Sequence, residues 1–326
     1  MMALLQMKKQ ATNKFRNGGK KNMKTNKEKK IIAPNECSFG RWLLVLVVGL
    51  TVGFILLVPL YLGMYGVEKS FMGISYTNIF SLLAFIPLFW GMVLSIRFIG
   101  KTPFKDFMLG VGGRINVKEC LIITGLFFGG FAIPYIMSAK NIEFRGVRPA
   151  EFAFLIFFML LTAWMQTTFE ELVFRGLLIR WGCKNKVGYS KKAIVLAIVN
   201  SVLFALFHAI NPEVLSQSGF LIPIAILTYA IPGFVLFLAD LHFGSLLPGC
   251  IIHLINNFLL YTVISSEVSV VTNPTLLVDK TPSHAIWSFV STAIAYLPVL
   301  VYILIDIRRR KRLPPLHTPR SDPDRA

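Results

Sequence analysis

Long apolar runs alternate with short polar segments along most of this 326-residue chain. A helix needs roughly 20 apolar residues to cross the hydrocarbon core of a bilayer, because each residue adds about 1.5 Å. By that criterion we predict about eight membrane-spanning helices, at residues 42–65, 76–96, 119–138, 151–180, 193–210, 221–239, 243–264 and 285–305. The expected fold class is all-α, a polytopic membrane helix bundle without a soluble domain.

The two ends of the chain differ from this apolar part. Residues 1–41 hold 11 of the 34 lysines and arginines, and residues 307–326 are basic and rich in proline. We expect two cytoplasmic tails, the first disordered, on either side of a membrane domain at 42–306. A net charge of +18 is also found in nucleic-acid-binding proteins, but basic residues beside apolar spans are typical of contact with anionic lipids. We therefore expect anionic lipids, and no nucleic acid, as partners of the tails.

Basic residues also predict the orientation of the spans, because short cytoplasmic loops are enriched in lysine and arginine. The loops after the second and fourth spans are basic like the two tails, whereas most of the intervening loops are not. The exception is 139–150, with Lys140, Arg145 and Arg148. We expect both termini in the cytoplasm and 211–220 outside, and the composition favours a bacterial plasma membrane.

The fourth span carries acidic residues. Eighteen uncharged residues lead into Glu170, Glu171 and Arg175 before the chain becomes apolar again. An ionised carboxylate deep in a bilayer costs about 2.5 to 3.5 kcal/mol on the insertion scale, so each acid needs a partner or a polar cavity. Glu171 and Arg175 are four residues apart and can pair on one helix face, while Glu170 points about 100° away. Glu171 is expected to be structural and Glu170 free for chemistry.

Few other side chains within the spans can act as acids, bases or hydrogen-bond donors. His208 lies in the fifth span, four residues after Phe204, and His253 and Asn257 share one face of the seventh. Glu170, His208 and His253 each lie about 15 to 24 Å from the expected cytoplasmic end of their span. They therefore occupy one layer near the middle of the membrane, where they can cooperate. Prolines 223, 232 and 248 are expected to interrupt the sixth and seventh spans and to free backbone carbonyl groups.

These motifs resemble those of the CPBP intramembrane proteases. That family includes the CAAX prenyl protease 2 type and bacterial relatives linked with bacteriocin processing and immunity. The family's EExxxR motif is matched at 170–175, its FxxxH at 204–208 and its HxxxN at 253–257. The resemblance covers about 150–265, and three motifs in this order on separate spans are specific.

The resemblance implies an intramembrane endopeptidase that hydrolyses a peptide bond of a membrane-associated peptide or protein. Glu170 would activate a water molecule with the help of His208, and His253 and Asn257 would hold the oxyanion. A buried carboxylate can serve as such a base, and imidazole and amide groups can donate to an oxyanion. The supporting residues would be Glu171, Arg175 and Phe204.

The sequence does not decide whether the protein depends on a metal. Glu170, His208 and His253 would give Zn²⁺ two imidazoles and one carboxylate, with a fourth position open. The chain has no HExxH motif, and its four cysteines lack CxxC spacing. The family's mechanism is described both with zinc and without a metal, so the sequence is compatible with either.

Two other function classes fit parts of the pattern. A proton-coupled transporter would use Glu170, Glu171 and the histidines as a proton relay, although the sequence shows none of the repeats typical of transporters. A catalytically idle immunity or scaffold protein would bind a peptide without cleaving it, but no motif residue is missing. The substrate is open between a prenylated CAAX protein and a bacteriocin-type peptide.

Overall fold

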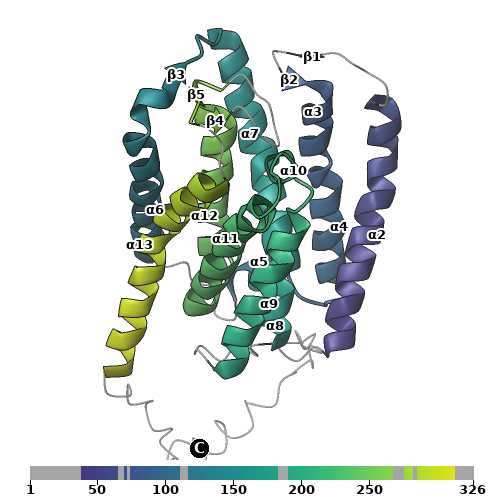
Figure 1. Ribbon diagram of the computed structural model, residues 1–326. Helices are drawn as coiled ribbons and strands as arrows, with labels where there is room; N and C mark the ends of the chain where they lie inside the picture. The colour runs from purple at the N-terminus through teal and green to yellow at the C-terminus, as the bar shows by residue number, and fades with distance from the viewer. Residues whose placement is uncertain are drawn as a thin grey trace, which may run out of the picture. The chain divides into compact units, whose positions relative to one another are not determined.

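The computed structural model describes residues 38–64, 70–71, 74–110, 117–182, 190–266, 275–281 and 285–312. The chain divides into two units, 1–32 and 33–326, and every described residue lies in the second. This unit is a bundle of helices (Figure 1), which confirms the polytopic helical fold.

The helices of the bundle follow one another with short connections. They are α2 (Phe39–Met64), α3 (Tyr76–Leu83), α4 (Phe85–Phe98), α5 (Phe104–Leu109), α6 (Val117–Met137), η1 (Ala139–Asn141), α7 (Pro149–Glu170), η2 (Glu171–Gly176), α8 (Leu177–Gly182), α9 (Lys191–Phe207), α10 (Pro212–Leu215), α11 (Leu221–Phe243), α12 (Leu247–Phe258), η3 (Leu259–Val263) and α13 (Ala285–Arg312).

The predicted count of eight spans is not confirmed. Among the described residues, six helices are long and apolar enough to cross a membrane: Phe39–Gly63, Asn78–Phe98, Val117–Met137, Pro149–Gly182, Leu221–Phe243 and Ala285–Arg309. The expected fifth and seventh spans correspond to α9, with 17 residues, and to the shorter apolar helix Leu247–Val263. At about 1.5 Å per residue, each covers about 25 Å, less than the roughly 30 Å of a bilayer core.

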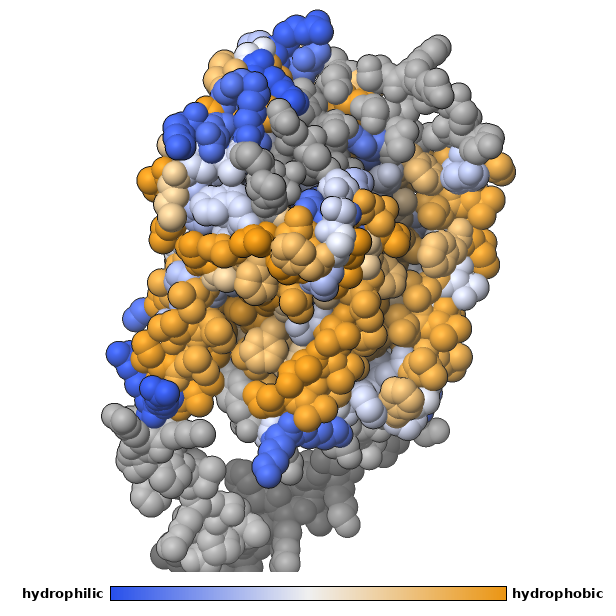
Figure 2. All heavy atoms as spheres, viewed as in Figure 1, coloured by the Kyte–Doolittle hydropathy of each residue, from blue (hydrophilic) through white to orange (hydrophobic). Residues whose placement is uncertain are grey.

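Helix contacts bring the three motif-bearing segments together. α7 packs against α4 and α12, and α11 packs against α9, α12 and α13. A buried apolar cluster that includes Phe127, Leu236, Ile252 and Val299 joins α6, α11, α12 and α13. Figure 2 shows hydrophobic residues over the middle of the visible face and hydrophilic residues toward its two ends. This distribution is the one expected for a bundle surrounded by lipid.

Two small β-sheets were not anticipated by the all-α prediction. β1 (Ser70–Phe71) pairs antiparallel with β2 (Ile74–Ser75). In the second sheet, β5 (Leu277–Asp279) lies between β3 (Ile142–Phe144), which is antiparallel to it, and β4 (Ile264–Ser266), which is parallel. Strands of two or three residues are too short to leave an alternating pattern in the sequence.

The boundary between the sixth and seventh predicted spans is shifted. α11 runs on to Phe243 and ends at Gly244, whose φ of 67° places it in the left-handed region that glycine adopts without strain. Pro248 does not interrupt a span, contrary to expectation, because it lies in the first turn of α12. A proline is tolerated there since that turn needs no backbone N–H.

The structure describes only the parts of the two predicted tails that adjoin the membrane domain, and these parts are largely helical. α2 already begins at Phe39, inside the predicted N-terminal tail, and residues 1–37 lie outside the described part. α13 continues to Arg312, so the helix takes up the first residues of the predicted C-terminal tail. Residues 313–326 are likewise outside the described part.

Candidate active site

The EExxxR segment lies at an irregular point of the fourth span. α7 ends at Glu170, and the chain continues as the π-helical turn Glu171–Gly176 before α8 begins. Single π-helical turns inside α-helices often occur at functional sites. Glu171 and Arg175 are fully buried, and Arg175 donates through Nη1 to Glu171 Oε1, which confirms the predicted ion pair. The same guanidinium reaches the carbonyl oxygen of Pro232, with 3.5 Å between Nη2 and O.

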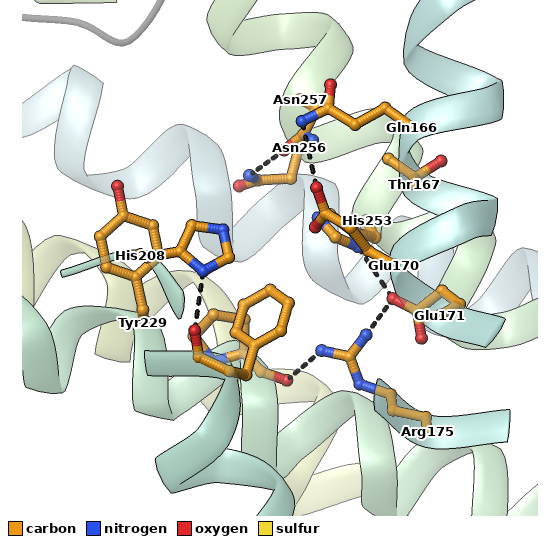
Figure 3. A network of polar contacts seen from close by, with 12 residues as sticks. Gln166, Thr167, Glu170, Glu171, Arg175, His208, Tyr229, His253, Asn256 and Asn257 are labelled. Atoms are coloured by element: carbon orange, nitrogen blue, oxygen red, sulfur yellow. Dashed lines mark hydrogen bonds and ion pairs between the residues drawn. The ribbon is translucent and has the colours of Figure 1, made fainter. Parts of the chain in front are cut away.

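α12 places His253 against both acids (Figure 3). The distance from His253 Nδ1 to Glu171 Oε1 is 2.8 Å, and that from Nε2 to Glu170 Oε2 is 3.5 Å. An ionised carboxylate only accepts hydrogen bonds, so Nδ1 is the donor to Glu171. Because Glu171 Oε1 accepts from both Arg175 and His253, this acid fixes two other members of the site.

Glu170 is held more loosely than Glu171. It is 7% exposed, and its Oε1 accepts a hydrogen bond of 3.2 Å from Gln166 Nε2, one turn earlier on α7. Its Oε2 is buried and makes no hydrogen bond within the described part of the chain. The 3.5 Å to His253 exceeds the usual N–H···O range of about 2.7 to 3.2 Å. One carboxylate oxygen is therefore left to accept from a bound molecule.

His208 lies at the end of a helix, not within one as the predicted span 193–210 implied. α9 ends at Phe207, and His208 is its C-cap residue. Its Nδ1 is 2.8 Å from the carbonyl oxygen of Phe204, and because a carbonyl only accepts, Nδ1 carries the proton. Within the described residues His208 makes no ion pair or hydrogen bond with Glu170.

Phe204 lies between the two histidines. Its ring centroid is 4.4 Å from that of His208 and 5.9 Å from that of His253. The guanidinium of Arg175 lies 4.8 Å from the same ring, within cation–π range. Phe204 is therefore central to the site, where the sequence predicted only packing or a supporting role.

Asn257 follows His253 by one turn on the same buried face of α12, as the spacing predicted. Its side chain is 8% exposed, and its Oδ1 accepts a hydrogen bond of 3.2 Å from Asn256 Nδ2. With the carbonyl end engaged in this way, the N–H groups of Asn257 are left as donors.

Asp240 is a member of the site that was not predicted from the sequence. This residue of α11 is 1% exposed and interacts electrostatically with Glu171 and Arg175. Its Oδ1 accepts from the Gly249 N–H at 2.9 Å, and a side chain at Gly249 would approach that oxygen to 2.5 Å. Asp240 was overlooked because it fell in the gap between two predicted spans. The sequence indicated it only as an acidic residue a few positions before Gly244 and Gly249.

The three residues predicted as metal ligands do not form one group in the described part of the chain. Among the described residues, no three His, Cys, Asp or Glu side chains are placed so that they could hold a metal ion. Glu170 and His253 are close to each other, but His208 is not grouped with them in the described residues, although its bond to the Phe204 carbonyl leaves Nε2 open. We therefore derive no step through a metal.

A comparison with known families tests the resemblance. The family model described as type II CAAX prenyl endopeptidase Rce1-like matches residues 151–259. This segment includes the three motifs and the helices that carry them. Over this third of the chain, the match bears out the predicted resemblance to the CPBP family. No curated protein and no solved structure matches the chain. The match supports a CAAX-type intramembrane endopeptidase, and together with the six apolar helices of the described residues it supports an integral membrane protein.

Proposed function

We propose that the protein is an intramembrane endopeptidase in which Glu170 activates a water molecule for attack on a peptide bond. The observation that carries this proposal is the buried Oε2 atom of Glu170, which has no hydrogen-bond donor within the described residues. A buried acid beside a histidine on a neighbouring helix suits general-base chemistry. The Rce1-like match supports the same reaction class.

The first step forms a tetrahedral intermediate. Glu170 Oε2 takes a proton from the water as its oxygen bonds to the carbonyl carbon of the substrate. The oxyanion accepts hydrogen bonds from His253 Nε2, when that atom is protonated, and from the amide of Asn257. The long distance of 3.5 Å from Nε2 to Glu170 leaves this donor available to the substrate.

The second step breaks the C–N bond. The leaving nitrogen takes up the proton that Glu170 received, and a carboxyl and an amino terminus result. We assign His208 to the side opposite Glu170, where its Nε2 accepts the proton of the newly formed carboxyl group while Nδ1 stays bonded to Phe204. In Figure 3, His208 lies on one side of the network, and Glu170 and His253 lie on the other. The scissile bond is then placed between them.

Glu171 and Arg175 keep the site in shape. Glu171 orients His253 through Nδ1, and Arg175 compensates the charge of Glu171. Buried ion pairs add little net stability, but each member is costly to leave alone. Their role in this proposal is to fix the position of His253 rather than to contact the substrate.

Two further assignments belong to the proposal. The family description makes a prenylated CAAX protein the first substrate to test, with a bacteriocin-type peptide as the second. We also propose that the two basic tails lie in the cytoplasm of a bacterial cell and contact anionic lipids. The proposal rests on the basic residues that flank the first and last spans.

The test is cleavage of membrane-tethered peptides of both classes by protein in liposomes. Glu170→Gln keeps the size of the side chain and removes the base, so we expect cleavage to fall by about 10² to 10⁴-fold with an unchanged folded yield. Glu151→Gln is the matched control, because it makes the same change on the first turn of α7. Near-parental cleavage by Glu170→Gln would refute the proposal. If the parent protein cleaves neither peptide but moves protons across the liposome membrane, the alternative function of a proton-coupled transporter would be favoured.

A further inference from the structure

A second polar cluster lies beside the proposed site and belongs to none of the three motifs. The Tyr229 hydroxyl of α11 donates to Glu213 Oε1 and accepts from Asn211 Nδ2 at 3.0 Å. Asn211 also reaches Glu213, with 3.4 Å from Nδ2 to Oε1. Glu213 belongs to α10, and Asn211 is the N-cap residue that precedes this helix. The phenol end of Tyr229 is thus held from two directions by the segment that connects α9 to α11.

The ring of Tyr229 is stacked on that of His208. The ring centroids are 4.4 Å apart, and the planes are inclined by only 19°. Figure 3 shows the two rings next to each other at the edge of the network. The His208 ring also contacts the Phe204 ring, with a distance of 4.4 Å between the centroids and an angle of 41° between the planes. Two aromatic rings therefore confine the imidazole.

This confinement matters because His208 has few other restraints. It follows the last residue of α9, and its recorded polar contact in the described structure is the carbonyl of Phe204. One hydrogen bond fixes a point of the ring but not its plane, so the imidazole could rotate about the Nδ1···O direction. The Tyr229 ring restricts that rotation and so sets the direction in which Nε2 points.

A second tyrosine is influenced both by this cluster and by Glu170. Tyr261 of η3 interacts electrostatically with both Glu170 and Glu213. Both carboxylates therefore act on the same phenol, while the direct link between this cluster and the proposed site is the stack of Tyr229 on His208.

We infer that Tyr229, held by Glu213 and Asn211, is a positioning residue that orients His208 for proton transfer. The inference rests on the proposed function, because it assigns Tyr229 no contact with the substrate. Tyr229 acts through the imidazole alone. When His208 takes up a proton, the Tyr229 face is also a favourable neighbour for the imidazolium.

Three substitutions separate the stack from its anchor. Tyr229→Leu removes the stack, Tyr229→Phe keeps the ring and removes the anchoring hydrogen bonds, and Tyr229→Trp restores a larger flat ring. A misplaced catalytic group costs up to about 10²-fold in rate. We expect kcat to fall by about 10 to 100-fold for Leu and by less for Phe, with partial recovery for Trp. KM should stay within about twofold, since substrate binding is not altered.

The matched control is Tyr61→Leu on α2, where the Tyr61 ring contacts Phe80. This variant should retain the parental kcat. A Tyr229→Leu variant with parental kcat, or with a change in KM alone, would overturn the inference. If Tyr229→Leu fails to fold, Tyr229→Phe still tests the inference, because parental kcat in that variant contradicts positioning that depends on the hydrogen bonds to Glu213 and Asn211.

A double variant tests the route of action. In a His208→Ala background, Tyr229→Leu should cause no further loss of kcat, because its effect passes through the imidazole. A multiplicative loss would show that Tyr229 acts independently of His208 and would refute the inference. Failure of the proposed function has a different signature, namely cleavage by Glu170→Gln at the parental rate.

Discussion

Individual buried charges show how the site balances chemistry against folding. Glu170, Glu171 and Asp240 are three buried acids, and Arg175 interacts with the latter two. Glu171 has the most complete set of partners, while Glu170 has one donor, Gln166, and a distant histidine. Of the two neighbouring glutamates, the one proposed for catalysis is therefore the one with fewer partners to lose.

This difference leads to opposite expectations for two neighbouring glutamates. Glu171→Gln and Arg175→Ala should each reduce the folded yield, because each leaves a buried partner without compensation. Loss of one member of a buried pair typically costs about 3 to 5 kcal/mol. Thermal unfolding in detergent and the monodisperse fraction on size exclusion measure the effect. Equal stability of Glu171→Gln and Glu170→Gln would contradict the division of roles.

The placement of His208 gives an expectation for metal dependence. Within the described residues His208 is not grouped with Glu170 and His253, so a metal shared by the three would require the imidazole, which is stacked on Tyr229, to move. We expect cleavage to persist in protein that has been treated with a chelator and verified as metal-free by elemental analysis. Loss of cleavage that added Zn²⁺ restores, with about one equivalent bound, would contradict this expectation.

At the scale of elements, close packing of α2 on α4 depends on a glycine. A methyl group at Gly91 would lie 2.4 Å from the Gly49 carbonyl oxygen and 2.7 Å from the Gly53 nitrogen. Backbone atoms cannot turn aside as a side chain can, so the two helices would have to separate.

Gly91→Ala should therefore destabilise the bundle by about 1 to 3 kcal/mol, as overpacking does. Gly125→Ala on α6 is the control, because nothing lies within 4 Å of the added methyl group. That change should be neutral or stabilising by up to about 1 kcal/mol, since alanine favours helices over glycine. Both are measured as shifts of the thermal unfolding midpoint. A Gly91→Ala midpoint at or above that of Gly125→Ala would argue against the close packing of these helices.

The same scale shows what the sequence could predict. Relations predicted from residue spacing along one helix are found in the structure: Glu171 pairs with Arg175, and His253 and Asn257 share a buried face. These relations depend on helical periodicity, which survives small errors in the ends of a helix. The apolar runs likewise predicted most helix boundaries to within a few residues.

Relations between helices were harder to predict. Contacts of Asp240 with Glu171 and of Tyr229 with His208 join residues far apart in the sequence, and no local pattern encodes them. The position of His208 at a helix end also escaped prediction, because the apolar run continues past Phe207 to Ile210. Hydrophobicity marks what lies in the membrane but not where a helix stops inside it.

For the whole molecule, the distribution of charge supports one orientation. The ends of α4 and α13 and the beginning of α9 lie toward one end of the bundle, and the sheet of β3, β5 and β4 lies toward the other (Figure 1). The first end carries basic residues such as Arg97, Lys191 and Arg308. Such enrichment is typical of the cytoplasmic side.

We therefore expect Lys101, next to α4, to face the cytoplasm and Glu143, in β3, to face outward. Both positions are exposed. In a variant whose four cysteines are replaced, a single cysteine at position 143 should react with a membrane-impermeant maleimide in intact cells. One at position 101 should react only after permeabilisation, and that second labelling also controls for intrinsic reactivity. Reaction at 101 in intact cells would reverse the orientation and place the basic ends of the bundle, with both termini, outside.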